Sequence, residues 1–288
     1  MAFARFFALL AAVALAGSAF TPDAKAQRGD LCPDGYAALT AGEADTAIDA
    51  FQACLSDRLY DWPVEAELRA RLGAAQLAAG EADAALLTYN QVFALVDGNG
   101  GDVDNPLMRR NRAAAYLQLD RHEEALEDID RALMVTPDDA FAQLLAGSAY
   151  LDLKRPEEAV AAFDTALRAD PGYVSAWIGR SAAFVELGFD QQAVADGREA
   201  VSIAPDDAGA LNALCWALVK AGRAADGLTI CDAAVEADPG SGPIVHSRAA
   251  ALEQLGRHQE AAELYARAYE LAPDDPEIIA DYARVHGR

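Results

Sequence analysis

The sequence predicts an all-α fold: a solenoid of about seven helix–turn–helix hairpins followed by a C-terminal capping helix. Two observations support this prediction, because prolines recur at an interval of 34 residues and small side chains recur in register with them. A unit of this length is a helix pair that cannot bury its apolar face alone and must stack on its own copies. The prolines that set the interval are Pro137, Pro171, Pro205, Pro239 and Pro273.

Small residues keep the same interval. Each proline is counted as position 32 of its repeat, since proline disfavours helix at the residue before it. Small side chains at positions 8 and 20 let two antiparallel helices approach closely, while larger residues at positions 11 and 24 fill the space around them. Position 20 is Ala125, Ala159, Ala193, Gly227 and Ala261, and position 27 is Ala132, Ala166, Ala200, Ala234 and Ala268.

One repeat carries most of a known family pattern. Its residues are Gln143, Ala146, Gly147, Tyr150, Ala159, Phe163, Ala166 and Pro171, and they resemble the tetratricopeptide repeat pattern. This resemblance implies a right-handed superhelical solenoid that binds other proteins.

The domain organisation follows from the repeats. We expect a signal peptide at 1–26 and then hairpins near 28–61, 66–97, 106–139, 140–173, 174–207, 208–241 and 242–275, with a capping helix at 276–288. Glycine supplies left-handed backbone at the turn inside most hairpins, at Gly42, Gly80, Gly188, Gly222 and Gly256, with Asp120 and Lys154 at the equivalent place in two others. Asp139, Asp207, Ser241 and Asp275 are expected to cap the helices that follow them.

Residues 1–26 have the features of a secretory signal. Arg5 precedes an apolar run from Phe6 to Gly17, and Ala24-Lys25-Ala26 forms a cleavage site, so we expect cleavage before Gln27. An uncleaved membrane anchor is the alternative, although the run is short for a membrane span. The expected location is therefore outside the cytoplasm, periplasmic or secreted, with no stable membrane anchor after cleavage.

The charge restricts the class of partner. The formal net charge of −23 repels nucleic acid and anionic membranes, and it favours encounter with a basic protein or peptide. The alternative is that the acidic surface only keeps an exported protein soluble.

The four cysteines predict two disulfides, because an even number in an exported chain favours bridges over free thiols. Cys215 and Cys231 are almost equidistant from the turn at Gly222, and Cys32 and Cys54 from the turn at Gly42. Residues equidistant from a hairpin turn lie opposite each other, which predicts Cys215–Cys231 and Cys32–Cys54. Buried reduced cysteines are the alternative.

The insertion at 98–105 has two interpretations. Its Asp and Asn residues could supply oxygen ligands for calcium, but Gly101-Asp102 inverts the order that an EF-hand loop requires. We therefore expect a mobile acidic linker.

No catalytic constellation is found in the sequence. His122, His246, His258 and His286 are scattered and form no metal-ligand spacing. No nucleophile elbow, phosphate loop or dinucleotide-binding glycine set occurs either. We expect no enzyme activity, no cofactor and no metal.

The family resemblance also implies a binding surface, because the first helix of each hairpin lines a concave groove. Residues expected to face the groove are Arg110, Leu117, Phe141, Leu144, Leu151, Ile178, Val185, Asn212, Trp216, Val219 and His246. Such a groove suits an extended peptide or a partner helix. Trp216 is the best anchor candidate, with packing against the adjacent helix as the alternative. A second hypothesis is a structural subunit of an envelope complex that uses its convex face or its ends.

Overall fold

The computed structural model describes residues 31–57 and 59–287, and within them it contains fifteen α-helices and no strand. The predicted signal peptide and its cleavage site lie outside the described residues. The helices are α2 (Pro33–Ala41), α3 (Ala44–Asp57), α4 (Trp62–Ala78), α5 (Ala82–Gly98), α6 (Pro106–Gln118), α7 (His122–Val135), α8 (Ala140–Asp152), α9 (Pro156–Ala169), α10 (Val174–Glu186), α11 (Asp190–Ile203), α12 (Ala208–Lys220), α13 (Ala224–Ala237), α14 (Gly242–Gln254), α15 (His258–Leu271) and α16 (Pro276–His286).

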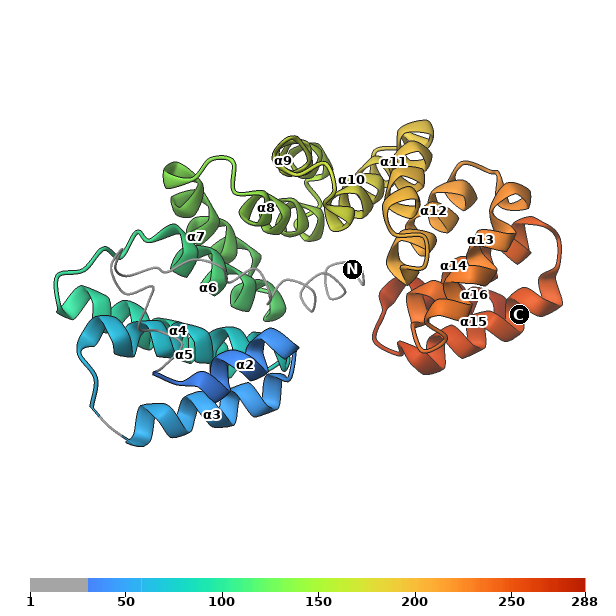
Figure 1. The fold of residues 1–288 in the computed structure, drawn as a ribbon. Helices are drawn as coiled ribbons and strands as arrows, with labels where there is room; N and C mark the ends of the chain where they lie inside the picture. Colours follow the sequence, from blue (N-terminus) through green and yellow to red (C-terminus); the bar gives the residue numbers. More distant parts are fainter. Residues whose placement is uncertain (1–30, 58, 288) are drawn as a thin grey trace. The chain divides into compact units, whose positions relative to one another are not determined.

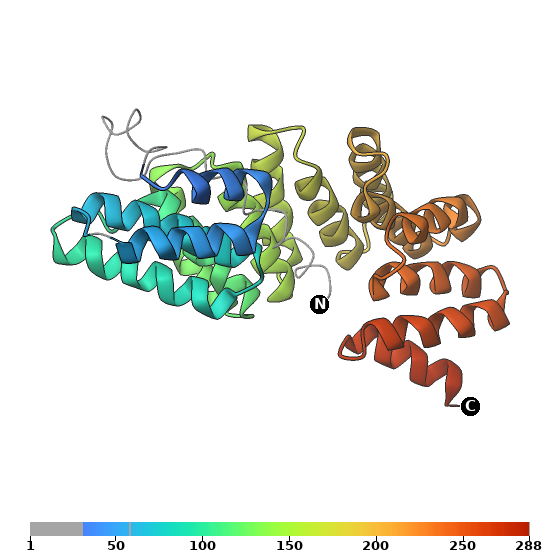
Figure 2. The ribbon, with the colours of Figure 1, turned by 60° about the horizontal axis from the view of Figure 1, so that its bottom comes forward.

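The chain divides into two compact units, and the division falls inside α8 between Ala149 and Tyr150. In the N-terminal unit, α2 packs on α3, α4 on α5 and α6 on α7 (Figure 1). In the C-terminal unit, α10 packs on α11, α12 on α13, and α14 on α15, with α16 against α14 and α15 (Figure 2). The order of helix pairs along the chain confirms the predicted all-α repeat fold.

The helix ends follow the predicted chemistry. The second helix of each of the last five hairpins ends two residues before its proline, as α7 does at Val135 before Pro137. The turn residues have positive φ at all seven expected positions, including the two that are not glycine, Asp120 at 57° and Lys154 at 59°. A side chain with a Cβ is strained in this left-handed region.

Three of the four predicted caps form. The carboxylates of Asp139, Asp207 and Asp275 each accept hydrogen bonds from backbone N–H groups in the next first turn. The prediction for Ser241 is wrong, because its hydroxyl makes no cap bond to α14. Pro243 occupies the second position of that helix and lacks the N–H that a cap would bind.

Positions 8 and 24 of a hairpin lie directly opposite each other. A Cβ added to Gly35 would lie 2.9 Å from the Phe51 ring, and one added to Gly73 would lie 2.9 Å from the Tyr89 ring. The two helices of these hairpins can approach only because position 8 has no side chain, and the aromatic ring then fills the space. The same pair of positions carries Cys215 and its partner in α12 and α13.

Candidate protein-binding face

The eleven residues predicted to face the groove differ in their accessibility. Seven are buried: Arg110, Phe141, Leu144, Ile178, Asn212, Val219 and His246. The other four, Leu117, Leu151, Val185 and Trp216, are half-buried. Three of these four occupy position 12 of their repeats, Leu117 in the N-terminal unit and Leu151 and Val185 in the C-terminal unit.

In the N-terminal unit, Arg110 and Phe141 pack against each other beside Asp139. The Arg110 guanidinium donates to Asp139 at 2.7 Å and lies over the Phe141 ring, 5.1 Å from its centroid. Because the buried arginine bonds the half-buried carboxylate that caps α8, it serves the junction between α6 and α8. Leu117 is the one predicted groove residue of this unit that is half-buried, the other three being buried.

In the C-terminal unit the accessible residues are Leu151 at the end of α8, Val185 on α10 and Trp216 on α12. We refer to these three, together with the buried Val219 on α12, as the apolar face. Helix α12 contributes two of its residues because positions 216 and 219 lie three apart, on one side of a helix. The Trp216 ring packs against His246 of a neighbouring helix and remains partly accessible, so its role as an anchor for a partner stays a prediction.

Trp216 is held between two nitrogen-bearing side chains. The ring of His246 on α14 lies 5.7 Å from the Trp216 ring, and the Lys220 ammonium lies 5.2 Å from the same ring. The Lys220 side chain is exposed, so it can move away when another group approaches the indole. The neighbouring side chains therefore hold the indole in place, and its accessible part is available for contact with another molecule.

A chain of hydrogen bonds extends from His246 to α16. Its Nε2 lies 2.9 Å from Asp281 Oδ2, and this contact lowers the pKa of the Asp281 carboxyl. Arg284 holds Glu253 through two bonds of 2.6 and 2.7 Å, which lowers the pKa of Glu253. Glu253 also accepts from the hydroxyl of Tyr265, whose pKa burial raises above its usual range.

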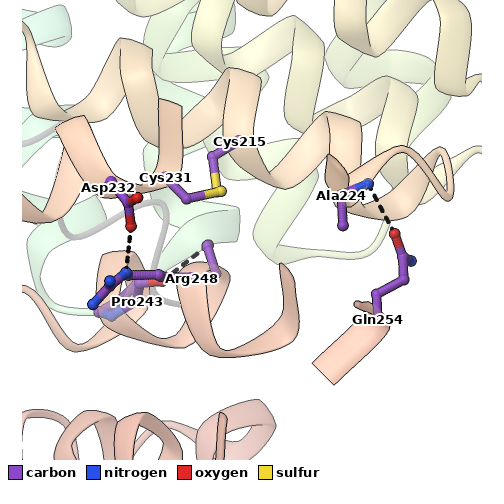
Figure 3. Close-up of a disulfide and its surroundings, with 8 residues drawn as sticks. Cys215, Ala224, Cys231, Asp232, Pro243, Arg248 and Gln254 are labelled. Carbon is purple, nitrogen blue, oxygen red and sulfur yellow. Dashed lines mark hydrogen bonds and ion pairs between the residues drawn. A yellow bond between two sulfur atoms is a disulfide. The ribbon is translucent and has the colours of Figure 1, made fainter. Parts of the chain in front are cut away.

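A disulfide lies behind the apolar face. Cys215 and Cys231 join α12 to α13, with Cα atoms 5.1 Å apart and no exposed surface on either residue (Figure 3). Gln254 at the end of α14 braces the turn of this hairpin, because its amide donates to Val219 O and accepts from Ala224 N, each at 3.0 Å. The second predicted pair, Cys32 and Cys54, is also joined.

The inserted segment 98–105 is attached to the α6/α7 hairpin. Arg109 donates to the Val103 carbonyl at 3.1 Å and to Asp104 at 2.8 Å. The same guanidinium reaches Asp128 at 2.7 Å, and Asp128 also holds Arg112. These bonds do not fit the expectation of a mobile linker, because the segment shares a buried carboxylate network with two helices.

The sequence also contains a regular arginine spacing that the analysis of the repeats did not identify. Arg112, Arg180 and Arg248 are spaced by two repeats, and each bonds a polar side chain on the preceding hairpin. Arg180 additionally holds Asp196 of its own hairpin at 2.7 Å, although burial still raises the pKa of that carboxyl. A search for columns repeating at twice the basic period would have found these residues.

Neither metal chemistry nor a membrane span is evident in the part of the chain that the structure describes. No three histidine, cysteine or carboxylate side chains among residues 31–57 and 59–287 gather closely enough to hold a metal ion. None of the helices in those residues combines the length and the apolar character needed to cross a membrane.

Family models match most of the repeat region. Two tetratricopeptide repeat models match residues 110–174 and 153–285. The chain belongs to the tetratricopeptide repeat family. Proteins of this family are protein-interaction scaffolds that bind protein or peptide partners, and the fold is typically not catalytic. No curated protein matches this sequence.

Solved structures share the repeat fold. A tetratricopeptide repeat protein of Parabacteroides merdae is 19% identical, with a TM-score of 0.67 over 91% of this chain and 99% of that one. PilW, a type IV pilus biogenesis factor, is 22% identical with a TM-score of 0.62 over 75% of this chain and 97% of its own. A repeat protein of Thermus thermophilus is 22% identical with a TM-score of 0.55, over 62% and 98% of the two chains.

Proposed function

We propose that this protein is an exported, non-catalytic scaffold that binds a peptide or helix of a partner protein on the apolar face of its C-terminal unit. The observation that carries the proposal is Trp216, which is half-buried on the first helix of its hairpin, as the apolar Leu151 and Val185 are on the first helices of the two preceding hairpins. A fixed indole gives large contact area at little cost in conformational entropy, which is typical of interface anchors. Leu151 and Val185 would supply further apolar contacts along the same face.

The partner is proposed to carry basic residues beside its apolar anchors. The net charge of −23 supports this, because a surface of one sign attracts the opposite sign over about 10 Å at moderate ionic strength. The interaction should therefore weaken as salt is added, whereas a purely apolar contact would not.

Export is supported by the two cysteine pairs, since structural disulfides persist in oxidising compartments. The predicted signal peptide at 1–26 agrees with this proposal. The resemblance to PilW is a likeness of fold, and an envelope location for this chain is part of the proposal.

The proposal is tested by capturing partners from the exported fraction with three forms of the full protein. One is the wild type, the second carries Trp216→Ala and Val185→Ser, and the third carries Met134→Ser and Val135→Ser as a matched control on α7. We expect the wild type and the control to enrich the same basic protein. Titration with the captured protein should then show the first double variant binding at least about 30-fold more weakly, as removal of a central tryptophan typically does.

A second candidate function rests on exposed apolar side chains of the second helices. Met134 and Val135 at the end of α7 are 81% and 56% exposed, and Leu87 on α5 is 60% exposed. Isolated exposed apolar residues are common, but these belong to helices outside the apolar face. If binding were lost in the Met134→Ser/Val135→Ser control and kept in the Trp216 variant, the protein would be a structural subunit that assembles through its second helices.

A further inference from the structure

Asn212 on α12 is a buried polar residue whose side-chain oxygen has no hydrogen-bond partner among residues 31–57 and 59–287. The residue is 4% exposed, and its Oδ1 is fully covered yet accepts no bond. Ser181 on α10 differs, because its buried hydroxyl donates to the Ala193 carbonyl at 2.9 Å. Burying an amide without a partner lowers stability, so the fold alone gives no reason for asparagine at this place.

Apolar side chains occupy the same repeat position in the two preceding hairpins. They are Leu144 and Ile178, and both are buried. An aliphatic side chain therefore suits this position and avoids an unsatisfied polar group. The amide nitrogen of Asn212 also makes no hydrogen bond within the described part of the chain, and unlike Oδ1 it is not fully covered. Asn212 thus has a free donor that another molecule can reach.

This donor lies beside the proposed anchor for a partner. Asn212 and Trp216 are four residues apart and share one side of α12, about 6 Å apart along the helix. An extended chain advances by about 6.6 Å over two residues. A segment with one side chain on the accessible part of the indole can therefore bring a nearby backbone carbonyl to the Asn212 amide.

We propose that Asn212 binds the main chain of the partner by donating from Nδ2 to a backbone carbonyl, so that the apolar face takes an extended segment and not a helix. The carbonyls of a helix are bonded within the helix, except in its last turn, whereas those of an extended segment are free. This inference rests on the proposed function and states which of the two partner conformations the face accepts.

The charge at the end of α10 favours a basic side chain in the same segment. Glu186 follows Val185 of the apolar face and is exposed. Its carboxylate lies 3.8 Å from the Lys154 ammonium, and an exposed pair of this kind contributes little in water. A lysine or arginine of the partner can replace Lys154 there. The occupant is therefore an extended segment with an apolar side chain for Trp216 and a basic one for Glu186.

The first test needs no partner. Asn212→Leu in the full protein should leave the midpoint of urea denaturation unchanged or raise it, because the variant loses no hydrogen bond of the fold. The matched control is Ser181→Ala, which removes a bonded buried hydroxyl and should lower the midpoint. A lower midpoint for Asn212→Leu as well would show that the fold uses this amide, and it would overturn the inference.

The second test measures the conformation of the bound segment. The probes are two displayed peptide libraries, one of linear random peptides and one presented as a helix on a stable helical scaffold. We expect the wild type to enrich linear peptides that carry apolar and basic residues. Each should bind Asn212→Leu about threefold to tenfold more weakly, which is the effect of losing one hydrogen bond. Trp216→Ala should weaken the same peptides.

The remaining outcomes separate this inference from the proposed function. Peptides that require Trp216 but bind Asn212→Leu unchanged, or peptides enriched only from the helical library, would overturn the role of Asn212 and leave the apolar face as the binding site. Peptides that bind Trp216→Ala unchanged, or no enrichment from either library, would overturn both.

Discussion

Replacing both Cys215 and Cys231 with alanine tests how much the disulfide behind the apolar face stabilises the C-terminal unit. The bridge closes a loop with a sequence separation of 16 residues. The entropy of closing such a loop in the unfolded chain corresponds to about 3 kcal/mol at 25 °C. Both residues have no exposed surface, so the lost packing of two sulfur atoms adds to this amount.

The assay is urea denaturation followed by circular dichroism, combined with hydrogen exchange to locate the change. We expect the free energy of unfolding to fall by about 3 kcal/mol and protection to fall first in α12 and α13. The matched control replaces Cys32 and Cys54, whose separation is 22 residues, in the first described hairpin. Its effect should be confined to α2 and α3, since a terminal repeat contacts a single neighbour.

A loss below about 1 kcal/mol would refute the loop-closure reasoning, because that is less than half of the expected entropy term. Equal loss of protection in both units after removal of Cys215–Cys231 would refute the assumption that the effect stays local. The wild type unfolded under reducing conditions provides an independent comparison, since it removes the bridges without altering any side chain in the sequence.

Further predictions concern the buried network, the turns and the acid limit. Asp128→Asn should destabilise the protein by about 3 to 5 kcal/mol in urea denaturation, because the buried Arg109 and the half-buried Arg112 lose their shared buried carboxylate, whereas Glu127→Gln on the exposed side of the same helix should change little. Lys154→Gly should raise the thermal midpoint, with a gain of about 1 kcal/mol from relief of positive φ, and a lower midpoint would contradict that strain. Below about pH 4 the exchange protection of α16 should fall, because protonation of Glu253 and Asp281, whose pKa values are lowered in the fold, removes stability that is present at higher pH. Unchanged protection of α16 at about pH 3 would show that these carboxylates do not hold the helix.

Burial could not be predicted at the groove positions. Phe141, Asn212 and His246 occupy positions that the family pattern assigns to the groove, yet each is covered by neighbouring side chains. The accessible surface of a residue depends on the size of side chains on other helices, which a repeat position does not specify. The residues that retain accessible surface, among them Trp216, are identified only after the helices are packed.

The hydrogen-bond partners of the polar residues likewise could not be predicted from the repeat pattern. Arg109, Asp104 and Asp128 come from a loop and two helices, and nothing in the proline interval indicates that they meet. Asp281 on α16 and His246 on α14 are 35 residues apart in the sequence. A pairing between such residues exists only when the helices that carry them are stacked.

The sequence by itself determined the helix pairs, their turns and the cysteine pairing, because each depends on residues close together in the chain. Proline ends a helix, glycine permits left-handed backbone, and two cysteines equidistant from a turn lie opposite each other. Tertiary structure alone decided which first-helix residues stay accessible, how segment 98–105 is attached and what holds α16. Those features are set by contacts between hairpins, where side chains from distant repeats compete for the same space and the same hydrogen bonds.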